Sequence, residues 1–365
     1  MKLIALKDVC KINMGQSPNS SSYNDYGDGM PFFQGNADFG ERYPITRVWC
    51  NTPTKIAQAE DILISVRAPI GALNYAKEEC CIGRGLAAIT PDRNKVSQDF
   101  IYWALKGKKA ELNDKGNGST FKAISRKILE ETMIPDINFE QQHKCAENLE
   151  KIYGIIQNRR KELLALDDLI KARFVEMFGD PVSNPKGWDM VELGELTGIG
   201  SSKRIFEKEY VSEGIPFYRT KEIVELSKGN SISTELYITE ERFAEIKEQY
   251  GVPKAGDLLI SAVGTIGIIW IVDGKNDFYF KDGNLIRVDS SDKFDSVYMK
   301  NLLENLIVEY KKQMSSGTAY AALTISGLTK MKVYDVPMEL QNQFADFVRQ
   351  VDKSKLMFQK LHQKL

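Results

Sequence analysis

One segment of this chain occurs twice. Aligning residues 59–71, which contain EDILISVRAPIG, with residues 255–267, which contain GDLLISAVGTIG, gives seven identities in thirteen positions. GMPFFQGNADFGE from Gly29 likewise resembles GIPFYRTKEIVEL from Gly214, and the order of the matching segments is kept throughout. Each copy is close to 180 residues long, whereas solenoid repeats span roughly 20–50 residues. The sequence therefore predicts two copies of one domain.

Each copy begins with short apolar runs that Gly, Pro, Asn and Asp interrupt, such as ILISV, LAAIT, LLISA, GIIWIV, FYF and LIRV. Runs of this length, rich in β-branched and aromatic residues, are typical of strands. A single helical pattern follows in each copy, SQDFIYWALKGKKAEL in the first and SVYMKNLLENLIVEYKKQM in the second. We expect two similar strand-rich domains of the α+β class.

A long helix is predicted between the two domains. From Gln141 to Phe178 there is no proline, and only Gly154 interrupts the pattern. Apolar residues recur mostly at steps of four and three, which is typical of a coiled coil. At 1.5 Å per residue the helix would be roughly 55 Å long. Gly179 and Pro181 in FGDP mark its end.

A second apolar stripe of similar spacing lies near the C-terminus. We expect the two helices to pair as an antiparallel coiled coil, which gives the chain an approximate two-fold axis, because a lone stripe on either helix would be exposed. The alternative is that each helix packs on its own domain. The predicted pairing positions are Leu149, Ile152, Ile156, Leu163, Leu166 and Ile170 in the first helix and Phe344, Phe347, Val351 and Phe358 in the second.

These patterns divide the chain into four segments. We predict a first strand-rich domain at 1–135, a central long helix at 136–180, a second strand-rich domain at 181–336 and a C-terminal long helix at 337–365.

Composition excludes several classes of protein. The net charge is −1, so the chain as a whole is not strongly basic. The five cysteines show no CxxC spacing and there are only two histidines, so neither a disulfide framework nor a metal site is expected. No run of eighteen apolar residues and no signal peptide are recognised. The simplest setting is a reducing cytoplasm.

The motifs GMPFF, EDILISVRAPIG, CIGRGLAAI, GSTFKAIS, IPDINFEQQ and ARFVEMFGDP occur in this order. In combination they resemble the specificity (S) subunit of type I restriction-modification systems, over essentially the whole chain. The resemblance implies that each strand-rich unit is a target recognition domain that reads one half of a split, double-stranded DNA sequence. It also implies that the helices set the spacer and dock two methyltransferase (M) subunits.

The resemblance also implies partners that carry the chemistry. M subunits would use S-adenosylmethionine to methylate adenine at N6, and restriction (R) subunits would use ATP and Mg²⁺. This chain shows no Walker A motif, NPPY-like tetrad or PD…ExK set, so we expect a non-catalytic subunit without a cofactor or metal of its own. The second helix stops at Leu365 without a second MFGDP, so the second M subunit is expected to dock differently or less tightly.

Loop residues able to reach base edges or phosphates are the candidate DNA contacts. Arg suits guanine, Asn and Gln suit adenine, and phosphate contacts fix the register. The glycines that flank Arg84 are expected to let the backbone approach DNA closely. The candidates are Gln16, Ser17, Gln34, Asn36, Arg67, Arg84, Thr120 and Lys122 in the first domain, and Ser202, Lys203, Arg204, Arg219, Lys221, Thr265, Lys281, Thr318 and Tyr320 in the second.

Three other interpretations remain open at this stage. Each candidate contact is also an ordinary solvated loop residue. The chain could be a coiled-coil adaptor whose duplicated domains bind proteins. It could also be a duplicated enzyme that uses Asp61 and Asp257, which occupy equivalent places, although an acidic turn residue is expected before a strand in any case.

Overall fold

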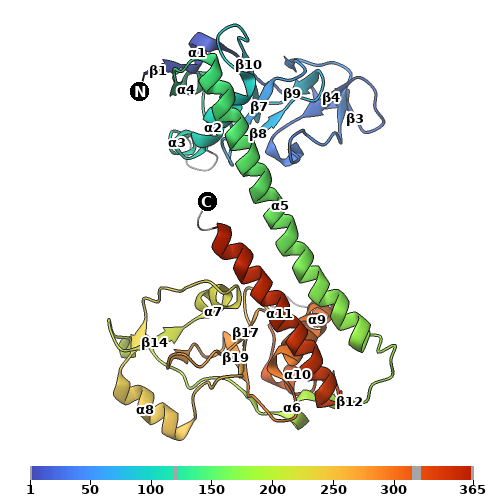
Figure 1. Cartoon of the computed structure of the whole chain (residues 1–365), viewed down its shortest axis with the longest axis vertical. Helices are drawn as coiled ribbons and strands as arrows, with labels where there is room; N and C mark the ends of the chain where they lie inside the picture. Colours follow the sequence, from blue (N-terminus) through green and yellow to red (C-terminus); the bar gives the residue numbers. More distant parts are fainter. Residues whose placement is uncertain (1, 118–121, 315–321, 363–365) are drawn as a thin grey trace. The chain divides into compact units, whose positions relative to one another are not determined.

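The computed structural model describes residues 2–117, 122–314 and 322–362, apart from the side chains of 313–314 and 358–362. The chain forms two compact units, Met1–Gln157 and Asn158–Leu365. The boundary between them falls inside the long helix α5 (Phe139–Phe178), drawn in green in Figure 1. This division differs from the sequence-based segments, which set the whole helix apart, because each half of α5 packs within a different unit.

Unit 1 is built around two sheets. The first is antiparallel, in the order β2 (Cys10–Met14), β10 (Leu86–Pro91), β7 (Ile62–Ser65), β8 (Leu73–Tyr75). The second has a parallel pair, β4 with β9, and runs in the order β3 (Tyr23–Asn24), β5 (Trp49–Cys50), β4 (Met30–Phe33), β9 (Cys80–Ile82), β6 (Ile56–Ala57).

The central strand β7 shows why residues 62–64 form a continuous apolar run. Ile62 and Ile64 pack into the cluster that also holds residues of helix α2, whereas Leu63 faces a second cluster with residues of β9. Alternate side chains of a strand point to opposite faces, so a strand that is covered on both faces has apolar residues at consecutive positions. Around the sheets lie β1 (Leu3–Ala5) paired with β11 (Met133–Pro135), helices α1 (Leu6–Val9), α2 (Gln98–Gly107), α3 (Lys109–Asp114) and α4 (Arg126–Glu130), and two 3₁₀ turns, η1 (Ser20–Ser22) and η2 (Asn36–Asp38).

Unit 2 repeats this topology. Its antiparallel sheet has the order β13 (Ile199–Gly200), β19 (Leu285–Val288), β16 (Leu258–Ser261), β17 (Ile269–Ile271). A second sheet, with β14 parallel to β18, has the order β15 (Tyr237–Ile238), β14 (Ile215–Tyr218), β18 (Tyr279–Phe280). The second sheets differ in size, but the equivalent order of the four-stranded sheets and the parallel pair in each unit confirm the predicted duplication.

The remaining elements of unit 2 follow the same plan, with α7 and α8 added beside the second sheet. The small sheet of β12 (Met190–Glu192) and β20 (Lys332–Tyr334) corresponds to that of β1 and β11. The helices are α6 (Leu193–Leu196), α7 (Thr220–Ser227), α8 (Glu240–Gln249), α9 (Ser296–Met314), α10 (Ile325–Thr329) and α11 (Met338–His362), with a 3₁₀ turn, η3 (Glu207–Glu209).

The duplication extends to single hydrogen bonds at the start of both long helices. Gln142 of α5 accepts a hydrogen bond from the Ser97 amide (2.7 Å), and Gln341 of α11 accepts one from the Asp295 amide (3.0 Å). Each glutamine also donates to a carbonyl five residues earlier, and each is only 3% exposed. The first turn of each long helix is thereby fixed to the globular part of its own unit.

The ends of α5 agree with the sequence signals. Asn138 caps the first turn by accepting from the Gln141 amide at 2.9 Å. The helix stops before Gly179, whose positive φ of 83° suits glycine, and the Gly179 amide donates to the Val175 carbonyl at 2.8 Å. Trp188 adds a bond from its indole nitrogen to the last carbonyl, that of Phe178.

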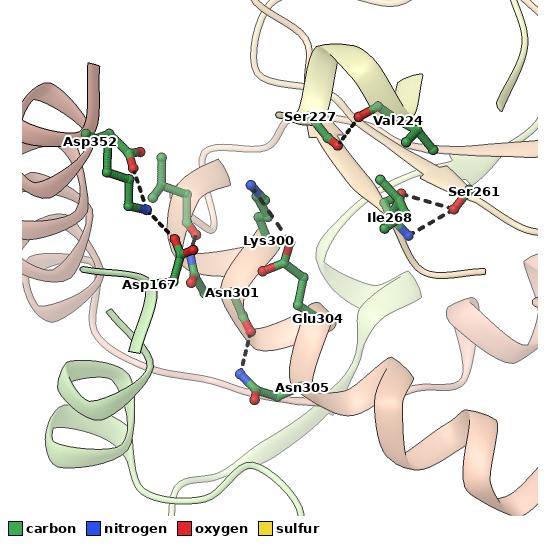
Figure 2. A network of polar contacts seen from close by, with 12 residues as sticks. Asp167, Val224, Ser227, Ser261, Ile268, Lys300, Asn301, Glu304, Asn305 and Asp352 are labelled. Atoms are coloured by element: carbon green, nitrogen blue, oxygen red, sulfur yellow. Dashed lines mark hydrogen bonds and ion pairs between the residues drawn. The ribbon is translucent and has the colours of Figure 1, made fainter. Parts of the chain in front are cut away.

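Within unit 2, the last turns of α5 pair antiparallel with α11. The Phe344 ring lies 5.4 Å from Phe174 and 5.6 Å from Phe178, measured between ring centroids. Farther along, Lys355 Nζ lies 2.7 Å from Asp167 and 3.1 Å from Asp352, as Figure 2 shows for the two carboxylates. Residue numbers along this contact fall from 178 to 167 on α5 while they rise from 344 to 355 on α11, so the two helices run antiparallel.

This pairing forms part of a larger core. Ile170 and Val351 are buried, and Leu166 and Phe347 pack against the cluster that contains the strands of unit 2. Leu163 and Ile156 are half-buried, whereas Leu149 and Ile152 in unit 1 are 41% and 43% exposed. Pairing at those exposed positions stays a prediction, and the Phe358 side chain lies outside the described residues. The buried positions of both helices also contact the globular part of unit 2, as the alternative interpretation expects.

The remaining features agree with the composition. All five cysteines are unpaired and four are buried. Burial raises the pKa of Cys10 and of Cys80 to about 12, which keeps both thiols protonated. Among the helices that the structure describes, none is both long and apolar enough to cross a membrane.

The anchoring of α5 in unit 2 can be tested by truncating Phe174, which is 1% exposed. Phe174→Ala is expected to lower the free energy of unfolding by about 3–5 kcal/mol, because it leaves a cavity among aromatic rings. Urea unfolding followed by circular dichroism measures this change. Leu164→Ala on the same helix, at a side chain 64% exposed, should change it by less than about 0.5 kcal/mol. Equal effects of the two changes would contradict the assignment.

Candidate nucleic-acid interface

Four predicted contact residues of unit 1 meet where strands β2, β4 and β9 end. The Gln16 amide donates to the Ile82 carbonyl at 3.0 Å. Ser17 Oγ accepts from the Arg84 amide at 3.2 Å and donates to the Gln34 side-chain oxygen at 3.0 Å. Residues far apart in sequence are thus joined in one set of loops.

Two further predicted cations adjoin these loops. The Val66 amide donates to the Gly85 carbonyl at 2.9 Å, which places Arg67 beside the Arg84 loop. The Ala68 amide then donates to the Lys122 carbonyl at 3.1 Å. We call Gln16, Ser17, Gln34, Arg67, Arg84 and Lys122 the unit 1 loop cluster.

The unit 1 loop cluster is cationic and open to solvent. Arg67, Arg84 and Lys122 are exposed, and within the described residues none of them has a carboxylate partner. Gln16 and Gln34 are exposed as well, and Asn36, in the turn after Gln34, is half-buried. Thr120 lies outside the described residues. Such a surface offers donors for phosphate oxygens and amides for base edges.

The glycines around Arg84 have a packing role that the sequence did not predict. A Cβ atom at Gly83 would lie 2.4 Å from the Gln34 side-chain oxygen, and one at Gly85 would lie 2.4 Å from the Gln34 carbonyl oxygen. A Cβ at Gly15 would lie 2.2 Å from the Gly83 carbonyl. These glycines let the loops pack against one another, and the closer approach of DNA that they were expected to allow stays a prediction.

A buried serine fixes the neighbouring loop in both units. Ser65 and Ser261 are 1% and 0% exposed. The hydroxyl of each donates to the carbonyl four residues ahead and accepts from the amide seven residues ahead. The repeated motif therefore holds one loop conformation, and that loop carries Arg67 in unit 1 and the exposed Thr265 in unit 2.

The duplicated carboxylates Asp61 and Asp257 close turns. Each accepts from the amide three residues earlier at 2.9 Å, and they are 4% and 3% exposed. Burial raises the pKa of Asp61. This arrangement is that of an acidic turn residue before a strand, and it gives the enzyme interpretation no support.

The predicted contacts of unit 2 also gather in adjoining loops. The Lys203 amide donates to the Tyr279 hydroxyl at 2.6 Å, and the Lys281 amide donates to the Tyr218 carbonyl at 2.8 Å. Because β14 and β18 run parallel, Arg219 and Lys281 leave neighbouring strand ends. The segments 201–204, 218–220 and 281–284 form what we call the unit 2 loop cluster.

Three of the four cations in the unit 2 loop cluster are paired with acids. Arg204 Nε lies 2.7 Å from Asp282, and the Lys281 ammonium lies 3.5 Å from the same carboxylate. Arg219 lies 3.0 Å from Glu222, which is 2% exposed. The bond from Asp282 raises the pKa of Arg204. Three of the predicted contacts are thus paired with acids in the free chain, and their contact with DNA stays a prediction.

The other predicted contacts of unit 2 differ among themselves. Lys203 lies over the Tyr250 ring at 5.2 Å from its centroid, and Lys221 is exposed on α7. Thr318 and Tyr320 lie outside the described residues. Ser202 is half-buried.

Asp282 was not among the predicted contacts, although it pairs with two of them. The signal that could have identified it is its position in the repeat, where it aligns with Arg84.

Comparison with known proteins identifies the family. The sequence model described as "Type I restriction modification DNA specificity domain" matches residues 1–165 and 185–365. The chain belongs to this family.

Individual relatives agree with this assignment. A Methanocaldococcus jannaschii protein provisionally named MjaX specificity subunit of a type I restriction enzyme is 47% identical over 152 residues, which are 42% of this chain and 36% of that protein. The MjaIX specificity subunit of the same organism is 27% identical over 263 residues, 64% of this chain and 60% of its own length. The chain thus spans between about a third and three fifths of these curated relatives.

A solved structure resembles nearly the whole chain. The S subunit of a type I restriction-modification system from M. genitalium has a TM-score of 0.59 and covers 98% of this chain and 91% of its own. Its sequence identity is 17%, so the likeness concerns the fold.

The packing role of Gly85 can be tested against a neighbouring glycine. Gly85→Ala is expected to destabilise unit 1 by about 1–3 kcal/mol, because the added methyl would collide with the Gln34 carbonyl. Gly35→Ala is the control, since a Cβ there meets nothing within 4 Å and the backbone is extended. Urea unfolding should separate the two variants, and equal stabilities would argue against tight packing of the loops.

Proposed function

We propose that this chain is the DNA-sequence-specificity subunit of a type I restriction-modification complex. Each unit would read one half of a bipartite double-stranded target. The long helices would set the spacer between the halves and dock two M subunits. The family match across both units supports this proposal, and so does the repeated topology, because one scaffold used twice suits a target made of two parts.

The observation that carries the proposal is the unit 1 loop cluster. Arginine, lysine and glutamine side chains from five separate loops are exposed together at one end of the sheets. Arginine and lysine bind phosphates and guanine, whereas glutamine pairs with adenine in the major groove. A protein-binding adaptor would not require cations without carboxylate partners, so this surface favours DNA over the adaptor hypothesis.

The chemistry would come from partner subunits. M subunits would bind S-adenosylmethionine and methylate adenine at N6, and R subunits, where present, would use ATP and Mg²⁺. This chain would supply the address, working in the cytoplasm of a bacterium or archaeon. Its own net charge of −1 implies modest affinity for DNA until the methyltransferase joins.

Methylation mapping tests the proposal. The chain is produced together with its neighbouring methyltransferase in a host without adenine methylation, and the genome is sequenced for N6-methyladenine. A split motif that needs this chain is expected, with one half altered when residues 1–135 are exchanged for those of a relative. A stable complex without methylation, or a motif that is not split, would contradict the two-domain reading.

Salt dependence tests the phosphate contacts of unit 1. Each lost phosphate contact lowers the slope of log binding constant against log salt by about 0.9. Arg67→Ala combined with Lys122→Ala should therefore lower the slope for the assembled complex by about 1.8. Fluorescence anisotropy at several salt concentrations measures it. Lys77→Ala removes an exposed charge at the opposite end of β9 and should leave the slope unchanged. If Lys77→Ala lowered the slope as well, binding would depend on the total charge of the chain and not on contacts at the unit 1 loop cluster.

A further inference from the structure

Three polar side-chain atoms in the unit 2 loop cluster are buried without a hydrogen-bond partner among the described residues. They are Ser202 Oγ, Thr220 Oγ1 and Asp282 Oδ1. Buried polar groups are nearly always paired, because an unpaired one destabilises the folded state. Their occurrence in three adjoining loops indicates a site that is completed by something outside the chain.

Asp282 is the charged member of this group. Its Oδ2 accepts a hydrogen bond from Arg204 Nε at 2.7 Å. Its Oδ1 has the Lys281 ammonium 3.5 Å away, close enough for an ion pair but without a hydrogen bond. The Asp282 side chain is 12% exposed, whereas that of Arg204 is 65% exposed. The guanidinium is therefore the solvent-facing partner of a largely buried carboxylate.

Asp282 occupies the place that Arg84 has in unit 1. In unit 1 the Gly83 amide donates to the last residue of β4, and in unit 2 the Lys281 amide donates to the last residue of β14, both at 2.8 Å. Arg84 and Asp282 each follow the donating residue directly. The same loop position thus carries a donor in one unit and an acceptor in the other.

These two side chains suit opposite base edges. In the major groove guanine presents the acceptors O6 and N7, which arginine contacts, whereas cytosine presents its N4 amino group, which aspartate accepts from. Ser202 and Thr220 hydroxyls can serve bases of either kind. A carboxylate facing guanine O6 or thymine O4 would instead meet another acceptor.

We propose that Asp282 is a base-reading residue of unit 2, which accepts a hydrogen bond from cytosine N4 once Arg204 has turned to a DNA phosphate. This inference rests on the proposed function and assigns a residue and a base to it. In the exchange Arg204 replaces one anionic partner by another, and Asp282 replaces the guanidinium by an amino donor. Arg204 thus keeps an anionic partner, and Asp282 keeps a hydrogen-bond donor and the Lys281 ammonium 3.5 Å away, so neither ion is left without a partner.

The test uses the full chain assembled with its methyltransferase. Binding is selected from duplexes randomised in the half of the target that unit 2 reads, and each variant is compared with the unaltered chain. Asp282→Asn is expected to relax the requirement for cytosine at one position by about 10–100-fold, because asparagine presents a donor as well as an acceptor. The unit 1 half should stay the same. An unchanged cytosine preference, or no cytosine at any selected position, overturns the inference.

Two variants separate reading from folding. Asp273→Asn removes an exposed acid from the loop before β18 and should leave the selected motif unchanged. Asp282→Glu keeps the carboxylate, so it should keep the cytosine requirement at lower affinity. Loss of that requirement in Asp282→Glu with an unaltered unfolding curve would contradict base reading.

Arg204→Gln separates the two roles in the exchange. It should weaken binding and lower the salt slope by about 1 without altering the motif. Relaxation of the same base position would show that Asp282 acts only by holding Arg204, and would overturn the proposal. Failure of the proposed function is distinct, because then the unaltered complex itself selects no split sequence.

Discussion

The fold depends on one helix that both units need. The forty residues of α5 begin in unit 1, where the buried Gln142 ties the first turn to the loop before α2. They end in unit 2, where Phe174 and Phe178 complete the aromatic core together with Phe344. The core of unit 2 is incomplete without the last turns of α5, and in unit 1 the Trp103 ring packs against Tyr153 of the same helix. The helix is thus a structural member of two domains as well as the connection between them.

The two units share their buried hydrogen bonds and differ in the residues of their loops. Ser65 and Ser261 hold equivalent loops with the same pair of hydrogen bonds, and the four-stranded sheets of the two units have the same strand order. Exposed residues on the held loops differ, as Arg67 and Val263 do at equivalent positions. Because the framework bonds are made by buried side chains and backbone, the exposed positions can change without loss of the fold. Such a division suits a scaffold that presents different chemistry in each copy.

Local signals account for what the sequence could predict. Apolar runs bounded by turn residues located the core strands, and Gly179 marked the end of α5 correctly, since both depend on neighbouring residues. The pairing of Arg204 with Asp282 joins residues 78 positions apart, which no local pattern reveals. The packing role of the glycines beside Arg84 was not predicted for the same reason, because their close neighbour, Gln34, is distant in sequence. The heptad pattern likewise identified apolar positions on α5 but not which surface covers each of them.

The contrast in charge pairing between the units bears on how such a protein would find its target. Exposed cations without carboxylate partners attract a polyanion over a distance of about 8–10 Å at moderate salt, whereas an arginine already bound to aspartate produces a much weaker field. If the chain reads DNA as proposed, unit 1 would make the first encounter and keep contact during one-dimensional diffusion. Unit 2 would bind only where contacts with the correct bases compensate for the release of Arg204 from Asp282. The order in which the two units bind DNA would then depend on which arginines are already ion-paired in the free protein.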